Sequence, residues 1–112
     1  MKKTFFASRI ITVGELEDNL EFTLEYYLLT TRIKDESSNR YTHCYGVEVV
    51  KKYIDLTGNE ISQKSSAKNI TTDKKAAYTF LRTIYNQKIT PVCLYEVIDD
   101  NIDEFEVRCM EA

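Results

Sequence analysis

The spacing of the apolar residues changes once along this chain, and that change limits the fold more than any other feature. Before residues 72–73, apolar and polar side chains alternate, which is typical of half-buried antiparallel strands. After them, apolar residues recur every third or fourth position, as on an amphipathic helix. The sequence therefore predicts an α+β fold in which strands come first and helices follow.

In the first part of the chain, the alternation of apolar and polar residues predicts four strands, at about residues 3–13, 21–33, 41–54 and 60–70. Polar residues of the kind that make turns lie between them. Because consecutive strands usually neighbour each other, the simplest sheet is an antiparallel four-stranded meander with the order 1-2-3-4. Gly46 falls inside the third strand, where glycine often marks a bulge or a close backbone approach.

The first predicted strand alternates only loosely. Simple alternation places Phe5, Arg9 and Ile11 on one face, and it places Phe6 and Ile10 on the other. Aromatic and β-branched residues dominate both sets, so the segment is a strand by composition as well as by spacing.

The second part of the chain predicts a two-helix hairpin that packs on one face of the sheet. The helices are expected at about residues 73–87 and 90–104, followed by a tail at 105–112. A length of 112 residues suits one core, so we expect residues 1–112 to form a single domain.

Both helices have a recognisable start. Thr72 or Asp73 can supply a side-chain oxygen that caps the first helix. Thr90 is the expected N-cap of the second helix. Pro91 then takes the first helical position, where a missing N–H costs nothing.

Charge is distributed unevenly around a net charge of only -3. Residues 62–88 hold six basic residues and one acid, which gives +5, whereas residues 95–112 hold seven acids and one arginine, which gives -6. The two stretches can be complementary solvated faces, can pair with each other, or can bind a partner. A chain with a net negative charge argues against nucleic acid as a partner, because such affinity comes mainly from basic side chains on phosphates.

The basic stretch nevertheless leaves an alternative function open, a small-ligand or nucleic-acid binding domain. Its candidate residues are Lys64, Lys68, Lys74, Lys75 and Arg82.

The second strand carries apolar residues on both faces. Tyr27, Leu29 and Ile33 add apolar surface to the face that alternation would leave polar. Exposed apolar patches usually mark interfaces. These three residues are therefore the candidate interface, with another protein or a second copy of the chain as the expected partner. The expected function is a non-catalytic regulatory or adaptor module.

No familiar catalytic or metal-binding pattern is present. His43 and Cys44 are adjacent on a strand and so point to opposite faces, which makes a poor catalytic pair. The acidic run at residues 99–104 lacks the glycine and the alternating oxygens of a calcium loop. No phosphate-binding glycine loop occurs. We therefore assign no catalytic residue, no metal ligand and no cofactor, while an enzyme with an unfamiliar site stays open.

The expected location is the cytoplasm. No apolar stretch approaches the roughly 20 residues that span a bilayer. Arg9 interrupts the apolar run near the start after five residues, which is short for a signal peptide. The three cysteines are far apart, with no CxxC pair, which predicts reduced thiols rather than a disulfide framework or a zinc site.

Four segments together resemble a family of small bacterial domains of unknown function from clostridial-type Firmicutes. They are residues 26–29, 45–49, 70–71 and 89–100, and the resemblance covers roughly residues 20–104. Its most specific part is the Thr-Pro-x-x-Leu-x-x-Val pattern that opens the last helix. The resemblance implies a compact α+β unit in a bacterial cytoplasm and no particular reaction.

Overall fold

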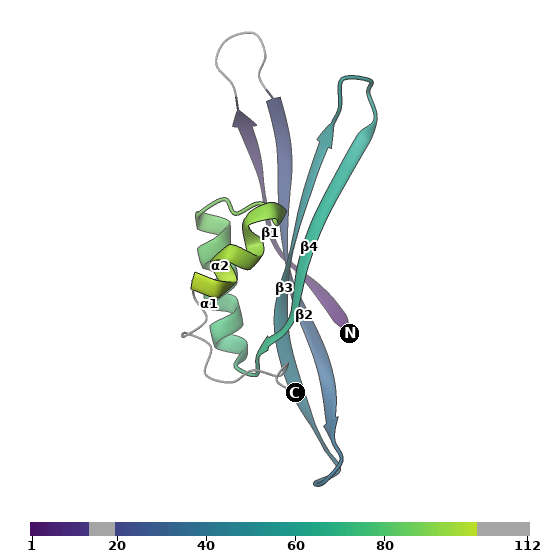
Figure 1. Ribbon diagram of the computed structural model, residues 1–112, viewed down its shortest axis with the longest axis vertical. Helices are drawn as coiled ribbons and strands as arrows, with labels where there is room; N and C mark the ends of the chain where they lie inside the picture. The colour runs from purple at the N-terminus through teal and green to yellow at the C-terminus, as the bar shows by residue number, and fades with distance from the viewer. Residues whose placement is uncertain (14–19, 101–112) are drawn as a thin grey trace.

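The computed structural model describes residues 1–13 and 20–100, and it contains one antiparallel sheet with helices on one face (Figure 1). The strands are β1 (Lys2–Val13), β2 (Leu20–Asp35), β3 (Arg40–Ile54) and β4 (Glu60–Thr71). Their spatial order is β1-β2-β3-β4, so the predicted meander is confirmed. The strands extend past the helices at both ends, and the β1–β2 and β3–β4 arms splay apart at the upper end of Figure 1.

The helices follow β4 and pack on the same face of the sheet. They are α1 (Lys74–Asn86), a 3-10 turn η1 (Pro91–Cys93) and α2 (Leu94–Asp100). The predicted helical hairpin is thus present, although the second helix begins as a 3-10 turn. Its expected continuation to residue 104 and the tail at 105–112 lie outside the described residues.

Alternation along the strands builds the core between sheet and helices. Leu24, Tyr26 and Leu28 of β2 project toward the helices and are buried. Val47 and Val49 of β3 continue the same layer. The helices contribute the following buried residues: Ala77, Phe80, Leu81, Ile84, Leu94 and Ile98. The apolar stripe read from the sequence is therefore the buried face of the helix pair.

Two irregularities interrupt the ladders of the sheet. One lies in β1 between Phe5 and Ala7, and the other lies in β3 between Tyr45 and Val47. The second confirms the expected role of Gly46. A Cβ atom at Gly46 would lie only 2.1 Å from the carbonyl oxygen of Ala67.

Both helical elements begin where the sequence predicts, but only the first has the expected hydrogen bond from its N-cap side chain. Asp73 is the N-cap of α1, and its carboxylate accepts a hydrogen bond from the backbone N–H of Lys75 at 3.0 Å. Thr90 precedes Pro91 as expected, but its side chain makes no capping hydrogen bond to a described residue. The fixed φ of Pro91 is therefore the main local signal for this turn.

Two long side chains tie the helix pair to the sheet. Arg9 of β1 donates from Nη1 to the carbonyl oxygen of Tyr85 at 2.8 Å, where α1 ends and its dipole favours a cation. Tyr26 donates from its hydroxyl to the carbonyl oxygen of Ile89 at 2.9 Å. Burial raises the pKa of Tyr26 to about 12, so this donor stays protonated well into alkaline solution.

The cysteines depart in part from the sequence prediction. Cys93 is a free, partly buried thiol. Cys44 is buried in β3 and is disulfide-bonded, so the prediction of reduced thiols is wrong for that residue. Distant cysteines carry no pairing signal in a single sequence, since the fold alone decides which ones meet. In residues 1–13 and 20–100, no helix is long and apolar enough to cross a membrane.

Candidate functional site

The sheet face turned away from the helices carries both ion pairs that the described residues make, together with aromatic contacts. We call it the far face. Alternation and strand register place the following side chains on it: Lys3, Phe5, Ser8, Ile10, Thr23, Glu25, Tyr27, Leu29, Ile33, Glu48, Val50, Lys52, Ser62, Lys64 and Ser66. No helix in the described part of the chain lies over it (Figure 1).

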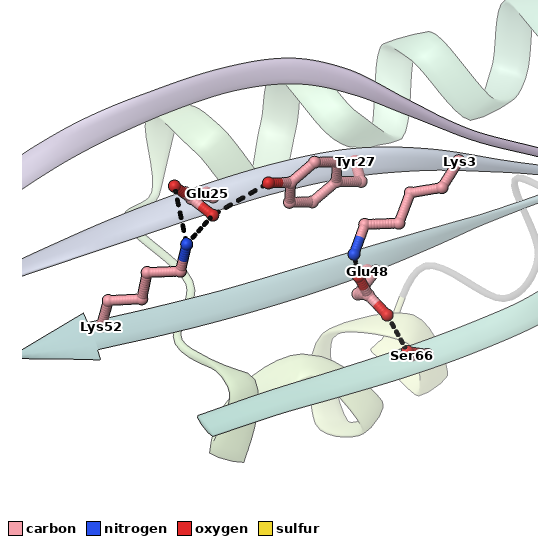
Figure 2. A network of polar contacts seen from close by, with 6 residues as sticks. All are labelled: Lys3, Glu25, Tyr27, Glu48, Lys52 and Ser66. Atoms are coloured by element: carbon pink, nitrogen blue, oxygen red, sulfur yellow. Dashed lines mark hydrogen bonds and ion pairs between the residues drawn. The ribbon is translucent and has the colours of Figure 1, made fainter. Parts of the chain in front are cut away.

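A buried carboxylate organises the centre of the far face. Glu48 of β3 is only 6% exposed, and its Oε2 lies 2.5 Å from Nζ of Lys3. Ser66 of β4 donates from its hydroxyl to the Oε1 atom at 2.7 Å. Figure 2 shows these two contacts of Glu48, which link β3 to Lys3 of β1 and to Ser66 of β4. The strands β1 and β4 are the two edges of the sheet.

The surroundings keep Glu48 ionised. Burial by itself raises the pKa of this carboxyl. The hydrogen bonds from Lys3 and Ser66, together with the positive charges of Lys3 and Lys64, outweigh burial and hold the pKa below its usual value. A charge this deeply buried is tolerated because it is paired and hydrogen-bonded.

Glu25 organises a second cluster next to the first. Its Oε1 lies 3.2 Å from Nζ of Lys52 and accepts a hydrogen bond from the Tyr27 hydroxyl at 2.9 Å (Figure 2). Burial raises the pKa of Tyr27, and the hydrogen bond to Glu25 and the nearby carboxylates raise it further. Tyr27 therefore stays a neutral donor at physiological pH.

Aromatic contacts connect the two clusters. Nζ of Lys3 lies 4.3 Å from the centre of the Tyr27 ring, which is within the range of a cation–π contact. Phe5 packs edge-on against Tyr27, with ring centroids 5.7 Å apart and an interplanar angle of 72°. These contacts link Lys3, Phe5 and Tyr27 into one group on the far face.

Replacing Glu48 with glutamine should test the first cluster. We expect the free energy of unfolding at pH 7 to fall by about 1–3 kcal/mol, because the ammonium of Lys3 loses its counter-charge. The lowered pKa means that the stabilisation is present above the unfolded-state pKa near 4.5 and is lost as pH falls through the folded-state pKa.

Urea unfolding at pH 7 and at pH 3 measures this difference. The difference in unfolding free energy between the native chain and Glu48→Gln should narrow at pH 3, because protonation of the carboxyl in the unfolded chain removes stabilisation that the lowered folded-state pKa provides at pH 7. Glu60→Gln is the matched control, since Glu60 is exposed on β4 and should change stability by less than about 0.5 kcal/mol. A gap at pH 3 as large as at pH 7 would contradict the ionised assignment.

A shallow depression of about 280 Å³ lies where the two arms of the sheet diverge. The residues that line it come from β2, β3 and β4: Glu21, Phe22, Thr23, Glu25, Lys52, Tyr53, Ile54 and Glu60. Glu25 and Lys52 are already paired there, as described above. Among residues 1–13 and 20–100, no group of three or more histidine, cysteine or acidic side chains could hold a metal ion.

The three predicted interface residues do share the far face, but they differ in exposure. Tyr27 is half-buried and Leu29 is 1% exposed, whereas Ile33 is 36% exposed near the β2–β3 hairpin. Leu29 thus offers no accessible surface in this structure.

Phe5 and Ile10 supply exposed apolar surface that the sequence prediction missed, at 55% and 65% exposure. Simple alternation put them on opposite faces. The bulge after Phe5 turns both Phe6 and Ala7 toward the helices, so that Phe5 and Ile10 lie on the far face together.

The predicted basic residues lie on different parts of the fold. Lys64 is on the far face, close enough to lower the pKa of Glu48. Lys68 is exposed on β4, Lys74 and Lys75 begin α1, and Arg82 is exposed on α1. The sheet therefore separates Lys64 from Arg82.

The comparisons with known proteins identify a family. A model of a family of unknown function (DUF6514) matches residues 8–104. The expected resemblance to a domain family of unknown function is confirmed, and the clostridial source stays a prediction. No curated protein and no solved structure matches the chain.

Proposed function

The chain belongs to DUF6514, a family of unknown function, and we propose that it is a non-catalytic protein-interaction module that binds its partner through the far face of the sheet. The observation that carries the proposal is the pairing of exposed apolar side chains with fixed ion pairs on a face that no described helix covers. Adaptor or regulatory activity would follow from what the partner does. Cytoplasmic location is part of the same proposal.

The composition of the far face suits protein recognition. Interfaces favour aromatic anchors at the centre of a patch with polar groups around them. Tyr27 and Phe5 form such an anchor, and the pairs of Glu48 and Glu25 hold the polar groups in place. Groups that are already ordered lose less conformational entropy on binding, so they support tighter binding.

The structure gives less support to the alternative function, in which the basic stretch forms a ligand-binding or nucleic-acid-binding surface. Its residues span both sides of the sheet, whereas phosphate binding is favoured by basic side chains clustered on one face.

Matched pairs of variants test the far face against the helix side. The far-face variant is Ile33→Asp with Lys64→Glu, which puts one acid on an apolar site and reverses one charge. The helix-side control is Val92→Asp with Arg82→Glu, which makes the same two changes at exposed positions of η1 and α1. Every replaced side chain is exposed, so both variants should stay folded, with the larger loss of stability in the far-face variant because Lys64→Glu removes a positive charge near Glu48.

The readout is quantitative co-purification from native lysate of the source organism, together with light scattering of the purified chain. A partner recovered with the native chain should persist in the helix-side control, and its binding should weaken by about tenfold or more in the far-face variant. A partner lost only in the helix-side control would contradict the proposal. A native chain that is monomeric and recovers no partner would contradict it as well.

A further inference from the structure

The two edges of the sheet differ in what lies beside them. At the β4 edge, η1 and α2 contact the strand, and the Tyr95 hydroxyl donates to the backbone carbonyl of Ser66. At the other edge, β1 runs for 12 residues and pairs only with β2 among the described residues. A long edge strand presents a row of backbone N–H and C=O groups on its outer side, which is a template for another strand.

Some of the features that usually protect an edge are missing from β1, although the strand does carry a bulge between Phe5 and Ala7. It contains no proline, and two of its three cations are used within the fold. Lys3 is held by Glu48, and Arg9 reaches the Tyr85 carbonyl. Four exposed side chains remain beside the edge on the far face: the apolar Phe5 and Ile10 and the uncharged polar Ser8 and Thr12.

We propose that two copies of this chain pair through β1 in an antiparallel register centred on Ser8, which makes one continuous eight-stranded sheet. The inference goes beyond the proposed function, because the second copy pairs at the β1 edge and does not contact Ile33 or Lys64. The bulge sets the register. Because Phe6 and Ala7 share one face, Phe5, Ser8 and Ile10 follow each other along the far face.

A two-fold axis at Ser8 therefore brings Phe5 of one copy opposite Ile10 of the other, twice. Aromatic and β-branched residues are favourable cross-strand partners. In the same register, Lys3 meets Thr12 and Arg9 meets the bulge residues Phe6 and Ala7, so no cation faces a cation. A self-complementary strand of this kind suits a closed two-fold dimer, in which both copies use the same surface.

Charge placement at the two apolar positions tests the register. The double variant Phe5→Lys, Ile10→Lys and the double variant Phe5→Asp, Ile10→Asp each set like charges opposite each other in a self-pair. Each should weaken dimerisation by more than about tenfold relative to the native chain. An equimolar mixture should form a heterodimer, because lysine then faces aspartate at both sites. Val92→Lys, exposed on η1, is the control and should dimerise like the native chain.

A second measurement does not depend on the apolar positions. Ser8→Cys places two thiols at the axis, within reach of a disulfide, so mild oxidation should yield a covalent dimer. Thr12→Cys, also exposed on β1 but away from the axis, should not. Light scattering should give a native mass of twice 13.1 kDa, and circular dichroism should show each variant folded.

A native chain that is monomeric at the highest concentration reached overturns the inference. So does a mixture of the two charged variants that stays monomeric, or equal cross-linking at positions 8 and 12. The proposed function is tested by a different result from the one that tests the dimer. A monomeric chain that still captures a partner in the helix-side control, and loses it in the far-face variant, would retain the interaction module and reject the second copy.

Discussion

Replacing Gly46 with alanine should destabilise this protein by about 3 kcal/mol or more, because the new methyl group has no room. A Cβ atom there would lie 2.1 Å from the carbonyl oxygen of Ala67 and 2.8 Å from the Cα atom of Lys68. Both are backbone atoms, so no rotamer change can relieve the clash. β3 and β4 would have to separate where the ladder between them shifts register.

Gly58 provides the matched control for this substitution. It lies in the β3–β4 turn with φ of +86°, and nothing would lie within 4 Å of a Cβ atom there. Gly58→Ala should therefore cost only the strain of the left-handed backbone, about 1 kcal/mol. Urea unfolding followed by circular dichroism measures both variants. Equal losses of stability at the two positions would refute the close approach at Gly46.

Gly46 also shows what kind of feature the sequence could predict. A glycine within a run of valine and tyrosine is a local signal, and the bulge that it indicates is present. The strand order and the start of α1 at Asp73 are similarly local, since short connections and a capping side chain suffice to predict them.

The far face could be predicted only in part, because its decisive contacts join distant residues. The ion pair of Lys3 with Glu48 joins residues 45 positions apart on strands that are not neighbours. No spacing rule connects them. The bulge in β1 had a comparable effect, since one extra residue moved Phe5 to the same face as Ile10. A shift of one residue reverses every later side chain in a strand, so loose alternation could not assign these faces.

Leu81→Ala should produce the second large effect, a loss of about 2–5 kcal/mol in the free energy of unfolding. Leu81 is 0% exposed and lies on the buried face of α1, in the cluster with Tyr26 and Val47. Removing its branched end would leave a cavity between helix and sheet, and close packing allows only partial relaxation around it. Thr79→Ala on the same helix is the control.

The control isolates packing from helix propensity. Thr79 is exposed, and its hydroxyl donates a hydrogen bond to the carbonyl oxygen of Lys75 one turn earlier, so alanine there should change stability by less than about 0.5 kcal/mol. Chemical unfolding at pH 7 compares the two. If Leu81→Ala cost no more than Thr79→Ala, the helix layer would not share one core with the sheet. The far face, which we propose as the binding surface, would then no longer be defined as the side of the sheet opposite the core.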